Sequence, residues 1–197
     1  IAVHQQNKRF SLCPPFRSPH HSISAVGLVG GGHHPSPGEL ALAHRGVLLL
    51  DEFPEFSRQA LEMLRQPLED YCVTVSRANY TVTYPTQFML VATMNPCPCG
   101  YSTDPERPCT CTDHMIQQYW KKLSGPILDR FDMVVHVPRL DQSDWFGADS
   151  TTTTFQSSLM RDRIHACRGV QKQREQKSWN AYLVPEEIRT WCQLDQS

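Results

Sequence analysis

The sequence lacks several features that would assign a function at once. It contains no Gly-Lys dipeptide, and so no P-loop of the form G-x-x-x-x-G-K-[S/T], in which backbone N–H groups and the lysine bind phosphates. It has almost no net charge, since 19 Lys and Arg residues face 20 Asp and Glu residues. Nucleic-acid binding would therefore need a local basic patch. A bilayer-spanning apolar run and a signal peptide are also missing, so we expect a cytoplasmic protein with no membrane partner.

Disulfide bonds of the kind found in exported proteins are also not expected. Eight cysteines are present, but their uneven placement and the missing export signal favour free thiols or a metal site over a disulfide framework. The 197 residues suffice for one sizeable core with a small appendage. Because the first residue is Ile1 rather than Met, we expect a segment of a longer protein.

The apolar run at residues 47–50 is the stretch around which the rest is organised. It ends in Asp51 and Glu52, and such a run is typical of a strand buried on both faces of a parallel sheet, whose carboxyl end reaches the ligand-binding edge. In a nucleotide-hydrolysing site, Asp51 would help to bind Mg²⁺ and Glu52 would polarise the attacking water. The alternative is an ordinary buried strand that runs into an acidic turn.

Two irregular segments precede this strand. Prolines within residues 10–24 forbid a helix and favour an extended edge strand or a loop. Arg17, His20 and His21 there would face phosphates or a metal, or would simply lie in a solvated polar loop. Residues 27–38 are rich in glycine, and without a Gly-Lys pair they predict a flexible projecting loop or a hairpin.

Helices are predicted on both sides of the acidic strand. Residues 39–44 predict a short helix that leads into it. After it, Ser57 is a suitable N-cap, and three leucines recur at helical spacing, which predicts an amphipathic helix to about Asp70. We interpret this apolar stripe as core.

A β-hairpin is predicted over residues 72–84, where side chains alternate with a period of two about a polar tip. Arg77, Asn79 and Tyr80 at that tip would grip a polymer backbone, and a solvated turn is the alternative. Residues 88–95 predict a second buried strand that ends in Asn95. If this strand is parallel to the acidic one, Asn95 would lie at the same edge and orient water against a γ-phosphate; otherwise it is a turn residue.

Four cysteines form two close pairs across a loop of little apolar content: Cys97, Cys99, Cys109 and Cys111. Four thiolates suit tetrahedral Zn²⁺, and the metal would hold such a loop together. The C-x-C spacing is tighter than the usual C-x₂-C, so reduced thiols or a labile disulfide are the alternatives. Four protein ligands would leave no open position, which argues against metal catalysis.

An arginine follows a predicted helix at residues 113–123. Arg130 precedes a predicted strand at residues 133–137 and has acids on both sides. It would pair with Asp129 or Asp132, or be presented to the phosphate of a neighbouring molecule.

The order of these pieces resembles the AAA+ ATPases of the hairpin-bearing branch, which includes the magnesium-chelatase ATPase subunit and the MCM helicases. Several short sequence segments make the chain similar to the magnesium-chelatase-like proteins of the YifB/ComM family. The similarity covers about residues 10–138 and continues more weakly to the end. The segments that carry the closer resemblance are residues 15–21, 29–32, 37–39, 42–44, 51–56, 95–100 and 124–126.

This resemblance implies an α/β fold, namely a partial AAA+ P-loop NTPase core with a parallel sheet and a β-hairpin before sensor 1. The core would occupy residues 1–140, followed by a threonine-rich linker at residues 141–157 and part of a helical lid at residues 158–197. The Walker A loop would lie before Ile1, and the sensor 2 arginine would lie after Ser197.

The resemblance also implies roles for particular residues. Asp51 and Glu52 would be the Walker B pair that serves Mg²⁺ and ATP, and Asn95 would be sensor 1. Arg130 would be the arginine finger that reaches the ATP of the next subunit in a homo-hexamer. The glycine-rich segment and the hairpin would be directed at the ring's pore and would touch DNA.

Three functions follow as hypotheses. The first is an ATP-driven ring motor that acts on DNA, as in the branch migration of natural transformation. The second is a chelatase-type ATPase that drives Mg²⁺ insertion into a porphyrin. The third, from a different class, is a zinc-stapled binding module without catalysis. In each case we expect the isolated chain to bind ATP weakly or not at all, and to be inactive.

Overall fold

The computed structural model describes residues 2–3, 10–11, 13–32, 35–77, 80–139, 156–174 and 179–193. The chain divides into two compact units, Ile1–Arg139 and Leu140–Ser197, and each is described by itself. The predicted linker at residues 141–157 lies almost wholly outside the described residues, so that assignment stays a prediction. In the described part of the chain, no helix combines the length and the apolar character needed to cross a membrane.

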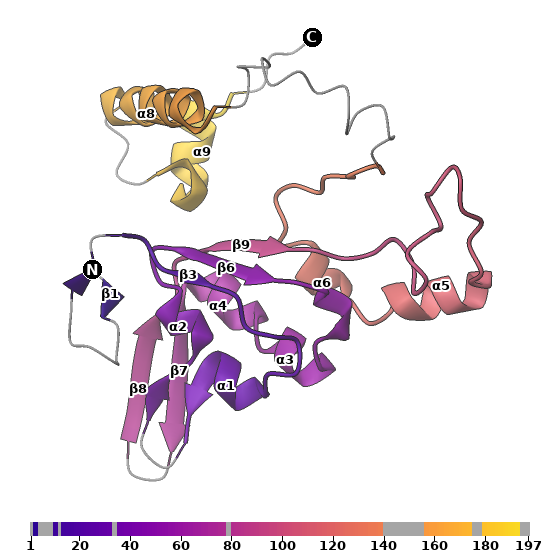
Figure 1. The fold of residues 1–197 in the computed structure, drawn as a ribbon. Helices are drawn as coiled ribbons and strands as arrows, with labels where there is room; N and C mark the ends of the chain where they lie inside the picture. The colour runs from indigo at the N-terminus through magenta and orange to yellow at the C-terminus, as the bar shows by residue number, and fades with distance from the viewer. Residues whose placement is uncertain are drawn as a thin grey trace. The chain divides into compact units, whose positions relative to one another are not determined.

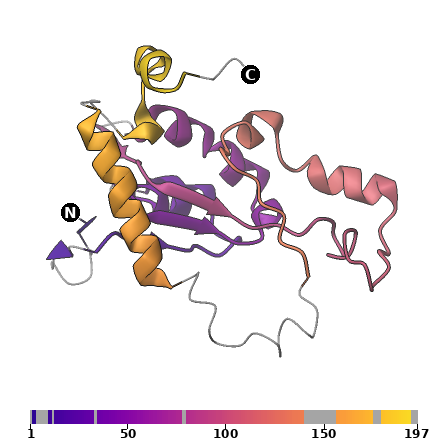
Figure 2. The same ribbon diagram turned by 90° about the horizontal axis from the view of Figure 1, so that it is seen from above.

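A parallel three-stranded sheet organises the first unit. Its strands are β3 (Phe16–Arg17), β6 (Val47–Leu50) and β9 (Met89–Ala92), in the order β3-β6-β9. Both neighbouring pairs are parallel, and Leu50 lies opposite Ala92. Helices α1 to α4 lie below this sheet in Figure 1, and Figure 2 shows the strands side by side from above. The predicted parallel α/β core is confirmed, although the second predicted strand is shorter than residues 88–95.

The glycine-rich segment forms a hairpin, the second of the two predicted alternatives. Helix α1 (Ala25–Val29) precedes strands β4 (Gly30–Gly31) and β5 (Ser36–Pro37), which pair antiparallel. Gly30 has a φ of 106°, which favours glycine because it has no Cβ. Residues 33–34 at the turn lie outside the described residues.

Helix α2 (Glu39–Leu42) confirms the short helix predicted before the acidic strand. Its first residue binds the edge strand: Nε and Nη2 of Arg17 each donate to one carboxylate oxygen of Glu39 at 2.6 Å. This bidentate bond raises the pKa of Arg17. Arg17 therefore ties β3 to α2, which neither of its two predicted roles anticipated.

The helix predicted over residues 57–70 is two helices, and the single-helix prediction is wrong. Ser57 does cap α3 (Arg58–Glu62), since its hydroxyl accepts from the Ala60 N–H at 3.2 Å. A turn then separates α3 from α4 (Arg65–Asp70). Pro67 explains the break, because its ring would clash with the carbonyl four residues earlier, that of Met63.

The predicted β-hairpin is confirmed. Strands β7 (Cys72–Arg77) and β8 (Tyr80–Pro85) pair antiparallel, with Arg77 opposite Tyr80. Val73 and Val75 are buried on one face. The other face carries a ladder of hydroxyls, with 3.0 Å between Thr74 and Thr83 and again between Ser76 and Thr81.

The strand predicted at residues 133–137 is wrong. Helices α5 (Asp113–Trp120) and α6 (Gly125–Leu128) are followed by an irregular segment at residues 131–139. Val134 is 91% exposed there, and the neighbouring apolar side chains are similarly accessible. The run of β-branched and apolar residues was a strand signal, but a strand needs a partner backbone, and no described residue pairs with this segment.

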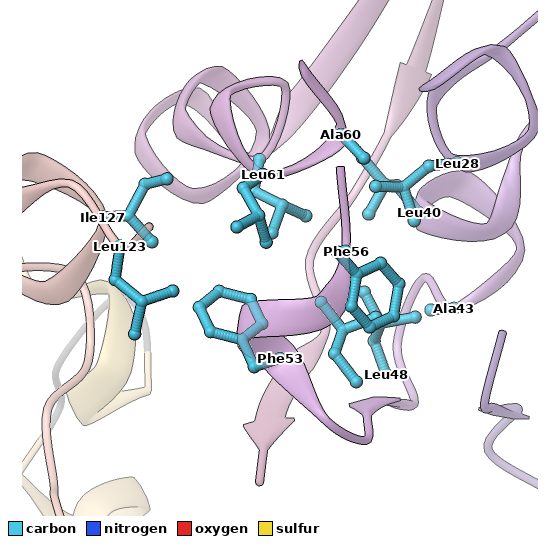
Figure 3. Packing of buried hydrophobic residues seen from close by; sticks show 12 residues of the cluster. Leu28, Leu40, Ala43, Leu48, Phe53, Phe56, Ala60, Leu61, Leu123 and Ile127 are labelled. Carbon is cyan, nitrogen blue, oxygen red and sulfur yellow. The ribbon is translucent and has the colours of Figure 1, made fainter. Parts of the chain in front are cut away.

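The apolar core of the first unit lies around the short 3-10 helix η1 (Phe53–Glu55), which follows the acidic pair. Phe53 is 2% exposed and meets the ring of Phe131 edge to face, with centroids 5.6 Å apart. Figure 3 shows Phe53 between Leu123 on one side and Leu48 on the other. The residues just after the candidate acids are therefore fixed by burial, which anchors that edge of the sheet.

The remaining elements are short or lie in the second unit. Strands β1 (Ala2–Val3) and β2 (Phe10–Ser11) pair antiparallel. The second unit contains α8 (Ser157–Gln173), η3 (Asn180–Tyr182) and α9 (Pro185–Trp191), which begins at a proline, a favourable first helical residue. Within this unit, the guanidinium of Arg168 lies 5.7 Å from the ring centroid of Trp179.

Candidate active site

Asp51 and Glu52 lie at the carboxyl end of β6, beside Thr93, which follows β9. The hydroxyl of Thr93 donates to Oδ1 of Asp51, and the Glu52 N–H donates to the same hydroxyl at 3.3 Å. The Phe53 N–H adds a backbone bond to the Thr93 carbonyl at 2.8 Å. The two strand ends are thus joined through one threonine. Sequence reasoning missed Thr93, although it is a polar residue placed directly after a strand that was identified.

Glu52 has an unusual backbone. Its φ of 53° and ψ of 48° lie in the left-handed region, which costs a residue with a Cβ about 1 kcal/mol or more. The side chain is 56% exposed, and its Oε2 lies 3.0 Å from Nδ1 of His21. The ring of His21 in turn lies 4.0 Å from that of His20 and meets Phe56 edge to face. His21 therefore faces the candidate base, a contact that the predicted phosphate, metal or loop roles did not include.

Asn95 follows β9 by three residues and is exposed. Its backbone N–H lies beside the hydroxyl of Tyr119; burial raises the pKa of Tyr119, and this N–H acts in the opposite direction. Because β6 and β9 are parallel, Asn95 is on the segment that leaves the same edge as Asp51. The side-chain contact to Asp51 is made by Thr93, however, so the water-orienting role of Asn95 stays a prediction.

Arg130 lies in the turn after α6. Nη2 of its guanidinium forms an ion pair with Oε1 of Glu69 in α4, not with either of the acids beside it in sequence. Its side chain is still 38% exposed. The structure therefore gives Arg130 an intramolecular partner, and its role toward a neighbouring subunit stays a prediction.

The tip of the β7–β8 hairpin is only partly described. Tyr80 is 36% exposed at the start of β8. Asn79 and the side chain of Arg77 lie outside the described residues. The DNA-contacting role of these three residues stays a prediction. The base of the hairpin is better defined, since the Tyr84 hydroxyl donates to the Pro35 carbonyl at 3.1 Å and links it to the glycine-rich hairpin.

The four cysteines of the 97–111 loop come together as the sequence predicted. Their Sγ atoms all lie within 4.8 Å of one another, and none of them forms a disulfide. Hydrogen bonds from the N–H groups of Tyr101 and Thr110 lower the pKa of Cys99 to about 5. Although the Cys111 N–H favours the Cys109 thiolate, burial and the neighbouring thiols raise the pKa of Cys109 to about 12. A bound cation would allow all four sulfurs to be thiolates together.

The donors at the carboxyl edge suit magnesium. The Asp51 carboxylate and the Thr93 hydroxyl are hard oxygen ligands of the kind that Mg²⁺ prefers, and they lie where ligands bind in open α/β sheets. An exposed carboxylate, Glu52, lies next to them and is suited to accept a proton or hold a water. A parallel sheet with these groups at its edge defines the fold as a partial P-loop NTPase core of the AAA+ type.

Comparison with known proteins identifies the family. The family model described as "Magnesium chelatase, subunit ChlI" matches residues 1–145, so the chain belongs to the magnesium-chelatase family. Competence protein ComM of Haemophilus influenzae is 45% identical over 181 residues, which cover 92% of this chain and 35% of that protein. The Escherichia coli protein YifB is 45% identical over 184 residues, with the same two coverages. The chain is therefore a member of the YifB/ComM type, and it spans 35% of the length of these relatives.

A more distant similarity connects the chain with replication proteins. The DNA replication licensing factor mcm2 of Schizosaccharomyces pombe is 30% identical over 97 residues, which cover 49% of this chain and 10% of that protein. The family and these relatives support an AAA+ ATPase family with ATP and Mg²⁺ as its cofactors.

Proposed function

We propose that these residues form the hydrolytic edge of an AAA+ ring ATPase that remodels DNA. The observation that carries the proposal is the group formed by Asp51, Glu52 and Thr93 at the carboxyl edge of two parallel strands. In this proposal, the oxygens of Asp51 and Thr93 would bind the metal, and those of Glu52 would accept the proton. A buried strand that merely ended in an acidic turn would not need a hydrogen bond from the neighbouring strand to its first acid.

Each residue has a distinct task in this proposal. Asp51, held by Thr93, binds Mg²⁺, which supplies positive charge to the phosphates when it is bound. Glu52 orients the attacking water and accepts its proton, and Asn95 holds that water from the adjoining segment. Arg130 leaves Glu69 and reaches the neighbouring subunit's nucleotide in a homo-hexamer. The P-loop that would cradle the phosphates is not among these residues, so the isolated chain is expected to be inactive.

The hydrolytic role is tested with Glu52→Gln in the complete gene product that carries these residues. Removing a general base lowers the rate by about 10²–10⁴-fold, so ATP turnover should fall by that factor while Mg·ATP binding persists. Glu62→Gln is the matched control, because Glu62 lies in α3 and pairs with Arg65 at 3.4 Å. Equal turnover in the two variants would refute the assignment of Glu52, whereas the zinc-stapled binding module would be favoured if neither the wild type nor the variants hydrolysed ATP.

The DNA role is supported by the relatives and by the two hairpins. Two of the relatives are named competence protein ComM and DNA replication licensing factor mcm2. The β7–β8 hairpin and the glycine-rich hairpin are joined by the bond between Tyr84 and Pro35, so both would meet one strand of DNA in a pore.

Branched DNA should stimulate turnover of the complete protein more than linear duplex. Arg77→Ala should weaken DNA binding. The slope of the logarithm of the binding constant against the logarithm of the salt concentration should become shallower by about one, which corresponds to the loss of one phosphate contact. Arg58→Ala, at the start of α3, is the control. An unchanged DNA affinity in Arg77→Ala would remove the hairpin tip from the proposal. The hexamer is checked by light scattering with Mg·ATP.

A chelatase-type ATPase is the second candidate, and the family description favours it. In that case turnover would respond to a porphyrin-binding protein partner and not to DNA. The same turnover assay, run with DNA or with a porphyrin-loaded partner, separates the two functions.

We further propose that the four cysteines of the 97–111 loop bind a structural Zn²⁺ ion. Four thiolates complete a tetrahedral shell, and they leave no position for a substrate.

A further inference from the structure

We infer that zinc in the 97–111 loop is a tether that holds helix α5 against the backbone at Asn95 and Pro96. This inference deepens the zinc site proposed above. It concerns what the metal fixes in the fold, and its functional consequence depends on the proposed role of Asn95.

The sulfur positions suit a tetrahedral metal. Sγ of Cys97 lies 3.4 Å from that of Cys99 and 3.7 Å from that of Cys109, and the latter two are 3.5 Å apart. Four sulfurs about 2.3 Å from zinc are separated by about 3.8 Å in a regular tetrahedron. The three distances among Cys97, Cys99 and Cys109 are thus close to this geometry, and Sγ of Cys111 lies within 4.8 Å of the other sulfurs. All three distances are too long for a disulfide, whose sulfurs are about 2.05 Å apart.

Backbone N–H groups lie beside the sulfurs. They favour the thiolate form and so act to lower the pKa: Ser102 beside Cys97, Tyr101 and Thr110 beside Cys99, Cys111 beside Cys109, and Cys99 beside Cys111. The Cys111 N–H lies 3.4 Å from the Cys109 sulfur. Such donors hold thiolates in place around a metal, as outer partners do in metal sites generally.

The loop itself has a fixed tip but little core. The Asp104 carboxylate accepts the N–H groups of Glu106 and Arg107 at 2.9 and 3.0 Å, and Arg107 donates to the Tyr101 hydroxyl at 2.6 Å. Within the loop, Cys97 is the buried apolar residue. Polar contacts at the surface contribute little against the entropy of ordering this chain, so a metal cross-link is the strong restraint that the composition allows.

The two ends of the loop lead to the same place. Cys97 comes two residues after Asn95, while Cys111 directly precedes Thr112, the N-cap of α5. At the other end of that helix, the Trp120 indole donates to the Pro96 carbonyl at 3.3 Å, and the buried Tyr119 lies beside the Asn95 N–H. Zinc would therefore link the two ends of the loop, so that α5 is connected to the Asn95 segment both through the metal site and through Tyr119 and Trp120. Without zinc, the contacts made by Tyr119 and Trp120 would still join α5 to this segment.

The metal content of the 197-residue chain gives the first test. Purified protein should contain one zinc per chain by elemental analysis. The double variant Cys97→Ser/Cys111→Ser should lose at least nine-tenths of it. The matched control Cys167→Ser/Cys192→Ser changes two exposed cysteines of the second unit and should keep one zinc. Iron in place of zinc, no metal, or equal loss in the control would overturn the inference.

The tether is tested by hydrogen exchange before and after zinc is withdrawn with a chelator. Amides of α5 and the amide of Asn95 should exchange at least tenfold faster, while those of β6 and β9 keep their protection, which excludes general unfolding. A chain whose other three tryptophans are changed to Phe should also show a red shift of Trp120 emission. Unchanged α5 exchange would refute the tether even if zinc is bound. The metal content and the hydrogen exchange are both measured without ATP turnover. The tether can therefore be confirmed or refuted independently of the Glu52→Gln test.

Discussion

The hydroxyl of Thr93 donates a hydrogen bond to the carboxylate of Asp51 across the gap between two parallel strands. Thr93 also receives the Glu52 N–H, so one side chain sets the position of both candidate acids. The polypeptide between Asp51 and Thr93 includes two helices and a hairpin. The contact is therefore a product of the sheet register, in which Leu50 lies opposite Ala92.

Thr93→Val should lower ATP turnover of the complete protein. Valine keeps the branched shape but leaves Asp51 without its donor, and a hydrogen bond to a charged group is worth about 1.5–3 kcal/mol. We expect turnover to fall by roughly 10- to 100-fold, since 1.4 kcal/mol corresponds to a factor of ten. Thr93→Ser retains the hydroxyl and should keep most of the activity. Equal turnover in Thr93→Val and wild type would show that Asp51 needs no such partner.

The sequence contained enough to predict the acids but not the residue that holds them. Asp51 and Glu52 end an apolar run, and that local pattern is visible in one segment. Thr93 acquires its role only from strand pairing, which periodicity does not specify. The same is true of His21, whose contact with Glu52 depends on how the chain returns after β3.

Leu61→Ala should be strongly destabilising, while Met63→Ala should not. Leu61 is 1% exposed in the core and Met63 is 45% exposed in the turn after α3. Removing a buried leucine side chain leaves a cavity and costs about 2–5 kcal/mol, whereas exposed substitutions stay within about 0.5 kcal/mol. Chemical denaturation followed by circular dichroism gives both values. Similar losses in the two variants would mean that the apolar stripe does not face the core.

The spacing of the leucines correctly predicted which side of residues 57–70 faces the core, but it wrongly predicted one continuous helix. The leucines do face the core, yet Pro67 breaks the helix into α3 and α4. Because proline disrupts the interior of a helix, Pro67 was a sequence signal from which the break could have been predicted. The strand predicted at residues 133–137 failed for a different reason, because its sequence is rich in β-branched residues and what it lacks is a pairing partner among the described residues.

Gly46→Ala should disturb the start of β6. A Cβ on Gly46 would lie 1.9 Å from the Pro15 carbonyl oxygen, which already accepts the Val47 N–H at 2.8 Å. Because the obstacle is backbone, β3 must move away, and we expect a loss of about 1–3 kcal/mol in the free energy of unfolding.

Gly169→Ala is the control for adding a methyl group. A Cβ at Gly169 in α8 meets no atom within 4 Å, so alanine should stabilise this helix by about 0.5–1 kcal/mol. A neutral Gly46→Ala would show that β3 and β6 approach less closely than this structure has them.

His44 should make the stability of the first unit depend on pH. Burial lowers the pKa of His44 below its usual 6.5, with a further contribution from the positive charge of Arg45. Its Nδ1 accepts the Gln87 N–H at 3.1 Å, at the entry to β9. Protonation would remove this acceptor. Since the unfolded chain binds the proton more readily, stability is fully present above about pH 6.5 and falls as the pH drops below it.

Replacing His44 with Asn isolates this contribution. The amide oxygen of Asn can accept the Gln87 N–H but does not titrate, so the loss of stability between about pH 6.5 and 5 should be smaller than in wild type. His136→Asn changes an exposed histidine in the irregular segment and should leave the wild-type pH dependence unchanged. The readout is the urea midpoint at several pH values from 5 to 8. If His44→Asn and wild type lose stability equally on acidification, protonation of His44 is not what lowers the stability of the first unit.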